Sequence, residues 1–228
     1  MTTQLYLISP PQIDDISQFS NILEEALSVE EGLVGAFQLR LKDEKPLEDG
    51  RTTHNAPSDE WVLAVAQKLK PICHKHDVAF ILNDNPQLAV DCGADGVHVG
   101  QEDGGIKAAR AIVGQDMVIG ATCHDSRHLS MSAGEEGADY VAFGAFYPTN
   151  SKTPEALEKW GTPTVDILNW WDEMMELPCV AIGGITPDNV KPLIDAGADF
   201  IAVISAVWNH PDGAAAGVEA FKSIMPQT

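Results

Sequence analysis

Short apolar runs alternate along the chain with longer segments in which apolar residues recur at helical spacing. The runs are rich in β-branched and aromatic residues and have the length of buried strands. Such alternation is typical of parallel strands joined by crossover helices. The predicted strands are Leu5–Ser9, Ala36–Lys42, Ala79–Asp84, Gly96–Gly100, Val118–Cys123, Tyr140–Phe146, Cys179–Ile185 and Phe200–Ala206, and the predicted helices lie near 15–30, 58–75, 86–92, 105–113, 126–136, 163–176, 187–196 and 213–224.

The eight strand–helix units predict one α/β domain, a single (β/α)8 TIM barrel that takes in residues 1–228. A barrel of this kind commonly needs about 200–250 residues, and no linker, low-complexity tract or solenoid repeat divides the chain. An open, doubly wound sheet is the alternative arrangement of the same units. The long polar segment 43–58 is expected to be a loop that covers or borders a site.

The tripeptide Gly-Ala-Asp occurs three times, each time just before a predicted strand. A glycine at this place can end the preceding helix in a left-handed conformation. We therefore interpret Gly93-Ala94-Asp95, Gly137-Ala138-Asp139 and Gly197-Ala198-Asp199 as helix-to-strand turns on the stability face of the barrel.

Composition narrows the class of protein. With 34 acidic and 14 basic residues the net charge is −20, which excludes a nucleic-acid binder held by bulk charge. The first residues lack the features of a signal peptide, and no apolar run approaches the roughly 18 residues of a membrane span, so we expect a cytoplasmic protein with no membrane partner. The sequence is compatible with a homo-oligomer.

The four cysteines, Cys73, Cys92, Cys123 and Cys179, are isolated in the sequence. They indicate neither a disulfide framework nor a zinc cluster, and we expect them to be buried or half-buried thiols.

The second predicted strand carries charges where a packed core would reject them. Side chains alternate along a strand, so Gln38, Arg40 and Lys42 share one face and Leu39 and Leu41 the other. If the leucines face the helices, an amide and two cations point into the barrel, where an anion is the natural partner. The alternative, an amphipathic strand facing water, conflicts with barrel strands being covered on both sides.

Two carboxylates follow neighbouring strands. Asp84 ends the third strand and Asp103 follows the fourth, and active sites of barrels lie at these carboxyl ends. The pair could share Mg²⁺, which is commonly held by one or two carboxylates together with substrate phosphate oxygens. Alternatively, each aspartate could cap the helix that follows it.

Phosphate-binding features follow the sixth, seventh and eighth strands. The segment Tyr147–Thr153 offers hydroxyls and Lys152, while Gly183, Gly184 and Ser205 allow close backbone approach to a second phosphate. Ordinary polar or packing turns are the alternative for both. A diphosphate carries about −3 near neutral pH, and its charge plus that of two aspartates would be balanced by Mg²⁺ and the cations Arg40, Lys42 and Lys152.

These motifs together resemble the thiamine phosphate synthase family over nearly the whole chain. The matching segments are Leu5–Leu7, Gln38–Lys42, Asn83–Asp84, Gly96–Asp103, Gly120–Thr122, Pro148–Lys152, Ile182–Ile185 and Ile204–Ser205. The resemblance implies a (β/α)8 barrel that joins hydroxymethylpyrimidine diphosphate to hydroxyethylthiazole phosphate with Mg²⁺. It implies pyrimidine diphosphate ligands at Gln38, Arg40, Lys42, Asn83, Thr122 and Lys152, thiazole phosphate ligands at Thr149, Ser151, Gly184, Ile204 and Ser205, and Mg²⁺ ligands at Asp84 and Asp103.

The sequence departs from the family pattern at three positions. Thr122 replaces the usual serine and Ser151 the usual threonine, so both keep a hydroxyl. Asn85 stands where an arginine often follows the Asn-Asp pair, which removes a positive charge near the expected metal site.

The expected reaction needs no protein nucleophile. Departure of diphosphate would come first, stabilised by Mg²⁺, Arg40, Lys42 and Lys152, and the thiazole nitrogen would then attack the carbocation-like carbon. His98, inside a strand, is expected to be a hydrogen-bonded core residue, whereas His124 is the better candidate for proton transfer. Two functions other than the synthase are considered. One is a thiazole tautomerase that uses His124, and the other is a non-catalytic protein that binds thiamine precursors.

Overall fold

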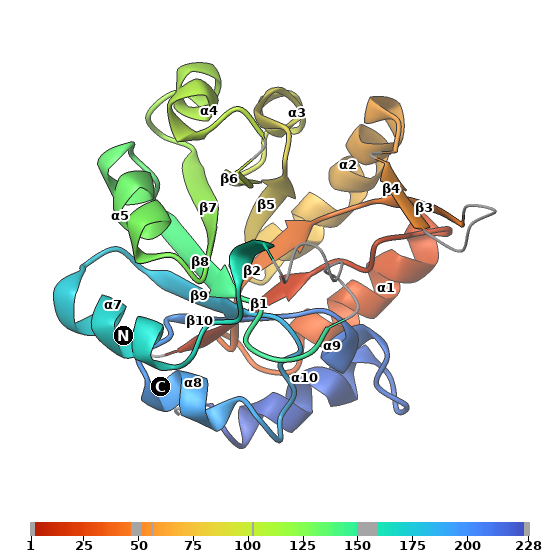
Figure 1. Ribbon diagram of the computed structural model, residues 1–228. Coiled ribbons are helices and arrows are strands. Elements are labelled where there is room, and N and C mark those ends of the chain that lie inside the picture. Colours follow the sequence, from red (N-terminus) through yellow and green to blue (C-terminus); the bar gives the residue numbers. More distant parts are fainter. Residues whose placement is uncertain (1–2, 47–51, 56, 102, 150–158, 226–228) are drawn as a thin grey trace.

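Eight parallel strands form a closed ring at the centre of the molecule (Figure 1). The computed structural model describes residues 3–46, 52–55, 57–101, 103–149 and 159–225. The ring closes because β1 pairs with β2 on one side and with β10 on the other, which excludes the open sheet. In order around the ring the strands are β1 (Gln4–Ile8), β10 (Phe200–Val203), β9 (Cys179–Ile182), β8 (Tyr140–Gly144), β7 (Val118–His124), β6 (Gly96–Val99), β5 (Ala79–Asn83) and β2 (Val34–Leu39).

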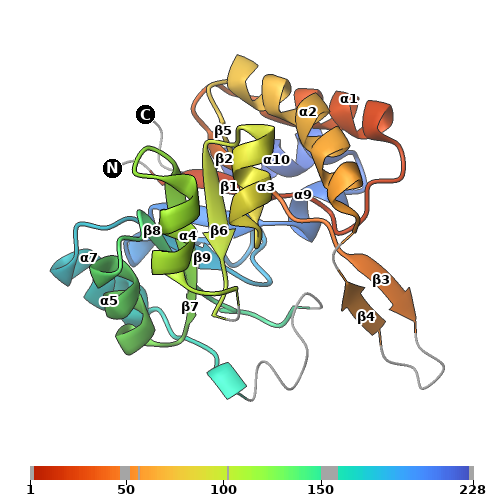
Figure 2. The same ribbon diagram turned by 90° about the horizontal axis from the view of Figure 1, so that it is seen from above.

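Helices between the strands cover the outside of the ring (Figures 1 and 2). Several begin at a side chain that accepts a hydrogen bond from the first turn, as Asp15 does from the backbone N–H of Gln18 at 2.9 Å. These caps account for helix starts close to those predicted. The helices are α1 (Ile16–Leu27), α2 (Asp59–Lys75), α3 (Pro86–Cys92), α4 (Ile106–Val113), α5 (Arg127–Glu135), α7 (Asp166–Met174), α8 (Lys191–Asp195), α9 (Ser205–Trp208) and α10 (Ala214–Lys222).

Alternation along the strands divides the core into two layers. Leu5 and Leu7 of β1 belong to the large apolar layer between strands and helices, whereas Tyr6 and Ile8 belong to a smaller cluster inside the barrel. Leu39 of β2 likewise packs outward, as predicted. The inner cluster is small, so the carboxyl end of the barrel has room for polar side chains and a cavity.

The three Gly-Ala-Asp turns tie neighbouring strands together at their amino ends. Asp95 Oδ2 accepts a hydrogen bond from the Phe80 N–H at 2.7 Å, and Asp139 Oδ2 accepts one from the Ile119 N–H at 2.7 Å. Asp199 repeats this contact with Cys179. The interpretation as structural turns is confirmed.

Several predicted boundaries are wrong at the mouth of the barrel. Strand β2 ends at Leu39 rather than Lys42, and residues 205–208 form α9 instead of continuing a strand. The chain leaves the shared hydrogen-bond ladder there and turns into loops. Residues 43–58, predicted as a loop, contain the antiparallel strands β3 (Asp43–Pro46) and β4 (Thr52–Asn55), which project from the barrel (Figure 2).

The cysteines and the apolar character of the helices also bear on the predictions made from composition. All four cysteines are free thiols that are buried or half-buried, as predicted. Within the described part of the chain, no helix combines the length and the apolar character that crossing a membrane requires.

Candidate active site

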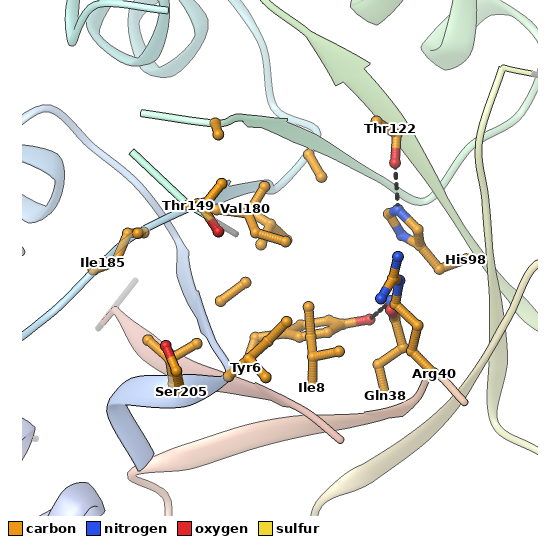
Figure 3. Close-up of a pocket in the computed structure, with 18 of the residues that line it drawn as sticks. Tyr6, Ile8, Gln38, Arg40, His98, Thr122, Thr149, Val180, Ile185 and Ser205 are labelled. Atoms are coloured by element: carbon orange, nitrogen blue, oxygen red, sulfur yellow. Dashed lines mark hydrogen bonds between the residues drawn. The ribbon is translucent and has the colours of Figure 1, made fainter. Parts of the chain in front are cut away.

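A cavity of about 340 Å³ opens at the carboxyl end of the barrel (Figure 3). Its walls come from strand ends and from the loops that follow them, where barrel enzymes place their chemistry. The volume falls within the range of about 300–1,000 Å³ that is usual for small-molecule sites. Eight of the residues predicted for the site line it: Gln38, Arg40, Asn83, Thr122, Thr149, Gly184, Ile204 and Ser205.

Ten of the lining residues form two groups on opposite sides of the cavity (Figure 3), and Tyr6 and Tyr140 also line it. One group, the polar arc, comes from the neighbouring strands β2, β5, β6 and β7 and consists of Gln38, Arg40, Asn83, His98 and Thr122. The other, the loop arc, follows β8, β9 and β10 and consists of Thr149, Gly183, Gly184, Ile204 and Ser205. The ring order of the strands therefore separates two binding regions within one cavity.

Beneath the polar arc, buried side chains form a continuous hydrogen-bonded chain. The amide Nε2 of Gln38 donates to the Tyr6 hydroxyl at 2.9 Å, and the Tyr6 and Tyr140 hydroxyls are 2.8 Å apart. His98 Nδ1 lies 2.9 Å from the Tyr140 hydroxyl, and its Nε2 lies 2.9 Å from the Thr122 hydroxyl. Five side chains thus connect two points of the cavity wall through the barrel interior.

Burial keeps this chain uncharged at neutral pH. Desolvation raises the pKa of the Tyr6 and Tyr140 phenols, and it lowers the pKa of His98 to about 4. The expectation that His98 is a hydrogen-bonded core residue is confirmed. Sequence reasoning missed both tyrosines, although the alternation of Tyr6 with the outward-facing Leu5 and Leu7 was a usable signal.

A charged cluster lies beside the cavity. Lys42 Nζ is 2.6 Å from Asp84 Oδ2, and Asp103 Oδ2 accepts a hydrogen bond from the Gly100 N–H at 2.7 Å. Burial first, and then the negative charge of Asp84, raises the pKa of Asp103. The structure thus brings the two predicted carboxylates together, and neither caps a helix, because Asn85 and Gly105 are the N-caps of α3 and α4.

This carboxylate pair fits a divalent cation. Two adjacent aspartates whose negative charges disfavour each other are relieved by a bound cation, and Mg²⁺ usually takes one or two carboxylates and completes its shell with waters and phosphate oxygens. No group of three or more His, Cys, Asp or Glu side chains suited to a metal occurs among the described residues, so an all-protein metal cage is not the type of site present in that part of the chain.

Lys42 differs from its predicted setting, and Asn85 has a capping role that was not predicted. Lys42 is absent from the cavity lining and lines a second hollow with Trp61 and Pro57. The prediction that it points into the barrel beside Gln38 is wrong, because β2 ends three residues earlier. Asn85, at the position where the family often has arginine, uses its side chain to accept a hydrogen bond from the Leu88 N–H at 3.1 Å.

The loops after β8 and β9 are locked together in the loop arc. Gly184 has φ +63°, and a Cβ there would overlap the Pro148 carbonyl oxygen and meet Tyr147 Cβ at 2.9 Å. The Gly184 carbonyl accepts from Asn189 Nδ2 at 3.0 Å, and the Tyr147 hydroxyl donates to the Asn189 carbonyl at 2.8 Å. This packing holds Thr149 in the same cavity wall as Gly184.

Three further predicted residues are not among those that the structure places in the cavity wall. Ser151 and Lys152 lie outside the described residues. His124, at φ 54°, stacks on the Trp160 ring with the ring centroids 4.4 Å apart and is not among the lining residues.

Together, the closed barrel and the polar cavity at its carboxyl end define a (β/α)8-barrel enzyme for small-molecule substrates. The family model described as "Thiamine monophosphate synthase" matches residues 5–207. The chain therefore belongs to the thiamine monophosphate synthase family, and it is an enzyme of the transferase class in thiamine biosynthesis.

Relatives in sequence and structure agree with this membership. The thiamine-phosphate synthase of Rhodospirillum centenum is 53% identical, with 97% of each chain covered. That of Erythrobacter litoralis is 51% identical over 96% of this chain and 93% of the relative. Among solved structures, thiamine phosphate pyrophosphorylase from Pyrococcus furiosus has a TM-score of 0.77 and 29% identity, covering 97% of this chain and 94% of that chain.

Proposed function

We propose that this protein joins 4-amino-5-hydroxymethyl-2-methylpyrimidine diphosphate to 4-methyl-5-(2-phosphoethyl)thiazole, giving thiamine phosphate and diphosphate. The observation that carries the proposal is the single cavity with two opposed binding arcs. A condensation of two phosphorylated molecules needs two regions of this kind within reach of one reaction centre. Family membership and relatives at 53% and 51% identity support the same reaction.

The polar arc is the proposed site of the pyrimidine diphosphate. Gln38, Asn83 and Thr122 offer hydrogen bonds to the ring and the phosphates, and Arg40 brings a positive charge to the cavity wall. Lys42 lies beside Asp84, close to the strand end that supplies Asn83. Together with Lys152, which is assigned from the sequence, Arg40 and Lys42 are the proposed catalytic cations.

The loop arc is the proposed site of the thiazole phosphate. Thr149 and Ser205 bring hydroxyls to the cavity wall, and Gly184 leaves its backbone open to close approach. Ile204 lines the same wall. Ser151 is added from the sequence alone.

Asp84 and Asp103 are the proposed ligands of Mg²⁺. When bound, the ion would supply positive charge to the leaving diphosphate oxygens. The salt bridge between Lys42 and Asp84 places a second cation next to the same carboxylate. This arrangement lets Lys42 contact the diphosphate from the side of the metal ligands.

The chemistry is a substitution at the pyrimidine methylene carbon. The C–O bond to diphosphate breaks first, and its electron pair leaves with the diphosphate, stabilised by Arg40, Lys42 and Lys152. The thiazole nitrogen then donates its lone pair to the cationic carbon and forms the new C–N bond. Because the two substrates lie in one cavity, the barrel supplies proximity rather than a nucleophile.

Neither competing function is favoured by the site. A tautomerase would use His124 for proton transfer, and in this structure that imidazole stacks on the Trp160 ring. A tautomerase would also have no diphosphate to bind with cations. A protein that only binds the precursors could use the same cations, so it is distinguished from a synthase by product formation.

The test is to incubate the purified protein with both precursors and Mg²⁺ and to measure thiamine phosphate and diphosphate in parallel. We expect equal amounts of the two products, and neither product when either precursor is omitted. Absence of diphosphate in the complete mixture would refute the proposal, and a rearranged thiazole without diphosphate would favour the tautomerase. The cytoplasmic location and a homo-oligomeric state are further proposals, which fractionation and light scattering can test.

A further inference from the structure

The buried hydrogen bonds beneath the polar arc run in one donor-to-acceptor direction, which follows from counting the protons of the side chains that make them. Gln38 Nε2 can only donate, so the Tyr6 oxygen is an acceptor in their 2.9 Å contact. Tyr6 then has one proton left to place, and the Tyr140 oxygen lies 2.8 Å away. If Tyr6 donates to Tyr140, the Tyr140 proton is free to go to His98 Nδ1.

The direction continues to the cavity wall. An uncharged imidazole whose Nδ1 accepts carries its proton on Nε2, and that N–H points at the Thr122 oxygen at 2.9 Å. Thr122 is then an acceptor within the chain, so its own hydroxyl proton is available to the cavity. In this order every hydroxyl and imidazole proton has a partner or faces the site.

The opposite order satisfies fewer groups. If His98 Nδ1 donated to Tyr140 and Tyr140 donated to Tyr6, the Tyr6 oxygen would receive two protons. Its own proton would then have no protein acceptor among the contacts of the described residues and could only point into the cavity that Tyr6 lines. Tyr6 is only 3% exposed, whereas Thr122, which holds the free proton in the first order, is half-buried. Buried donors without acceptors are disfavoured, so the first order is the stable one.

A glycine in β7 makes room for the hydrogen-bonded side chains. A Cβ at Gly120 of β7 would overlap the Tyr140 ring, so the strand omits a side chain where the phenol crosses it. The Tyr140 ring also packs 5.6 Å from the His98 ring and 6.0 Å from the Tyr6 ring, measured between centroids. These ring contacts hold the hydroxyl oxygens and the imidazole nitrogens in the positions that the hydrogen bonds require.

We propose that Tyr6, Tyr140 and His98 are positioning residues. Their hydrogen bonds present Gln38 to the ligand as an acceptor and Thr122 as a donor. At one end, one N–H of the Gln38 amide donates to Tyr6, which fixes the orientation of the amide and leaves its carbonyl oxygen as an acceptor for the ligand. At the other end the Thr122 hydroxyl faces the ligand as a donor. This inference rests on the proposed function, since an aminopyrimidine diphosphate offers an amino group to the first and phosphate oxygens to the second.

The first test reads the proton positions directly and does not depend on activity. In protein labelled with 15N-histidine, the long-range 1H–15N NMR spectrum distinguishes the two neutral tautomers, and the H98Q variant identifies the His98 signals. We expect the Nε2–H tautomer at neutral pH, and we expect Tyr140→Phe to move the Nδ1 resonance as its hydrogen bond is lost. Tyr147→Phe is the matched control, because the Tyr147 hydroxyl bonds to Asn189 and takes no part in the buried hydrogen bonds that connect Gln38 to Thr122. A proton on Nδ1, or an Nδ1 resonance unmoved by Tyr140→Phe, would overturn the proposal.

The second test uses kinetics. His98→Leu removes the donor to Thr122, and we expect KM for the pyrimidine diphosphate to rise about tenfold, as for the loss of one buried hydrogen bond, with KM for the thiazole phosphate unchanged. His98→Gln keeps an amide N–H that can reach Thr122 and should restore most of the affinity. Equal KM changes for both substrates, or no rescue by glutamine, would contradict a positioning role. Wild-type protein without turnover would refute the proposed function and leave the NMR result to decide the inference.

Discussion

At the scale of single residues, the fully buried groups of the site are uncharged, and its charged groups are half-buried. The barrel interior holds phenols, an amide and a neutral imidazole, whereas Lys42, Asp84 and Asp103 lie beside the cavity. Strand alternation was enough to predict that Gln38 and Arg40 reach the cavity. It failed for Lys42, because the point where a strand leaves its ladder depends on hydrogen bonds between distant segments that a local pattern does not contain.

Lys42 gives a direct test of the proposed leaving-group stabilisation. Lys42→Ala should lower kcat/KM by about 10²-fold or more, as expected for losing one preorganised electrostatic contact. Lys107→Ala is the matched control, because Lys107 lies on the outer helix α4 with its side chain 76% exposed. Steady-state kinetics measure both variants. A Lys42→Ala enzyme as active as the control would remove Lys42 from the mechanism.

The carboxylate pair should control the metal requirement. Asp84→Asn and Asp103→Asn each remove one negative charge, and we expect the Mg²⁺ concentration for half-maximal activity to rise about tenfold or more. Asp91→Asn, at an exposed position of α3, makes the same chemical change away from the cavity. Titration of activity with Mg²⁺ is the measurement, and identical midpoints in all variants would exclude the pair as ligands.

At the scale of elements, the two binding arcs reproduce the order of strands around the ring. Apolar periodicity predicted all eight strands of the barrel and most helix bounds closely. They missed β3 and β4, because polar residues dominate 43–58 and no apolar alternation marks a strand there. The contact of the β8 and β9 loops could not be predicted either, since it depends on packing between Tyr147 and Asn189, which are 42 residues apart in sequence.

Gly184 tests whether that loop contact shapes the thiazole phosphate site. In Gly184→Ala, the new methyl group would push against the Pro148 carbonyl, and we expect KM for the thiazole phosphate to rise about tenfold or more with little change for the pyrimidine diphosphate. Gly213→Ala is the matched control, because Gly213 also has a positive φ, +94°, but nothing lies within 4 Å of its Cβ position. Equal kinetic effects of the two alanines would mean that backbone strain alone is responsible.

At the scale of the whole molecule, the buried imidazole links stability to pH. The pKa of His98 falls from an ordinary value of about 6.5 to about 4 in the folded protein, so the unfolded chain binds more protons between these values. Folding stability is therefore complete above about pH 6.5 and is lost as the pH falls toward 4, by about 3 kcal/mol.

Urea unfolding between pH 7 and pH 4 measures this contribution. We expect the free energy of unfolding to fall more steeply with decreasing pH in the wild-type protein than in His98→Gln. The other histidines and the carboxylates are the same in both proteins, so they cancel in the comparison. Parallel curves would show that His98 does not contribute to the acid sensitivity.

The pairing of β1 with both β2 and β10 also has a consequence for biosynthesis. While the nascent chain is on the ribosome, β1 keeps one unpaired edge until residues 200–203 have emerged. Unpaired edges are templates for association with other chains. Translation that pauses before this point would leave that edge of β1 unpaired, so the last strand of the barrel is also the one that protects the first.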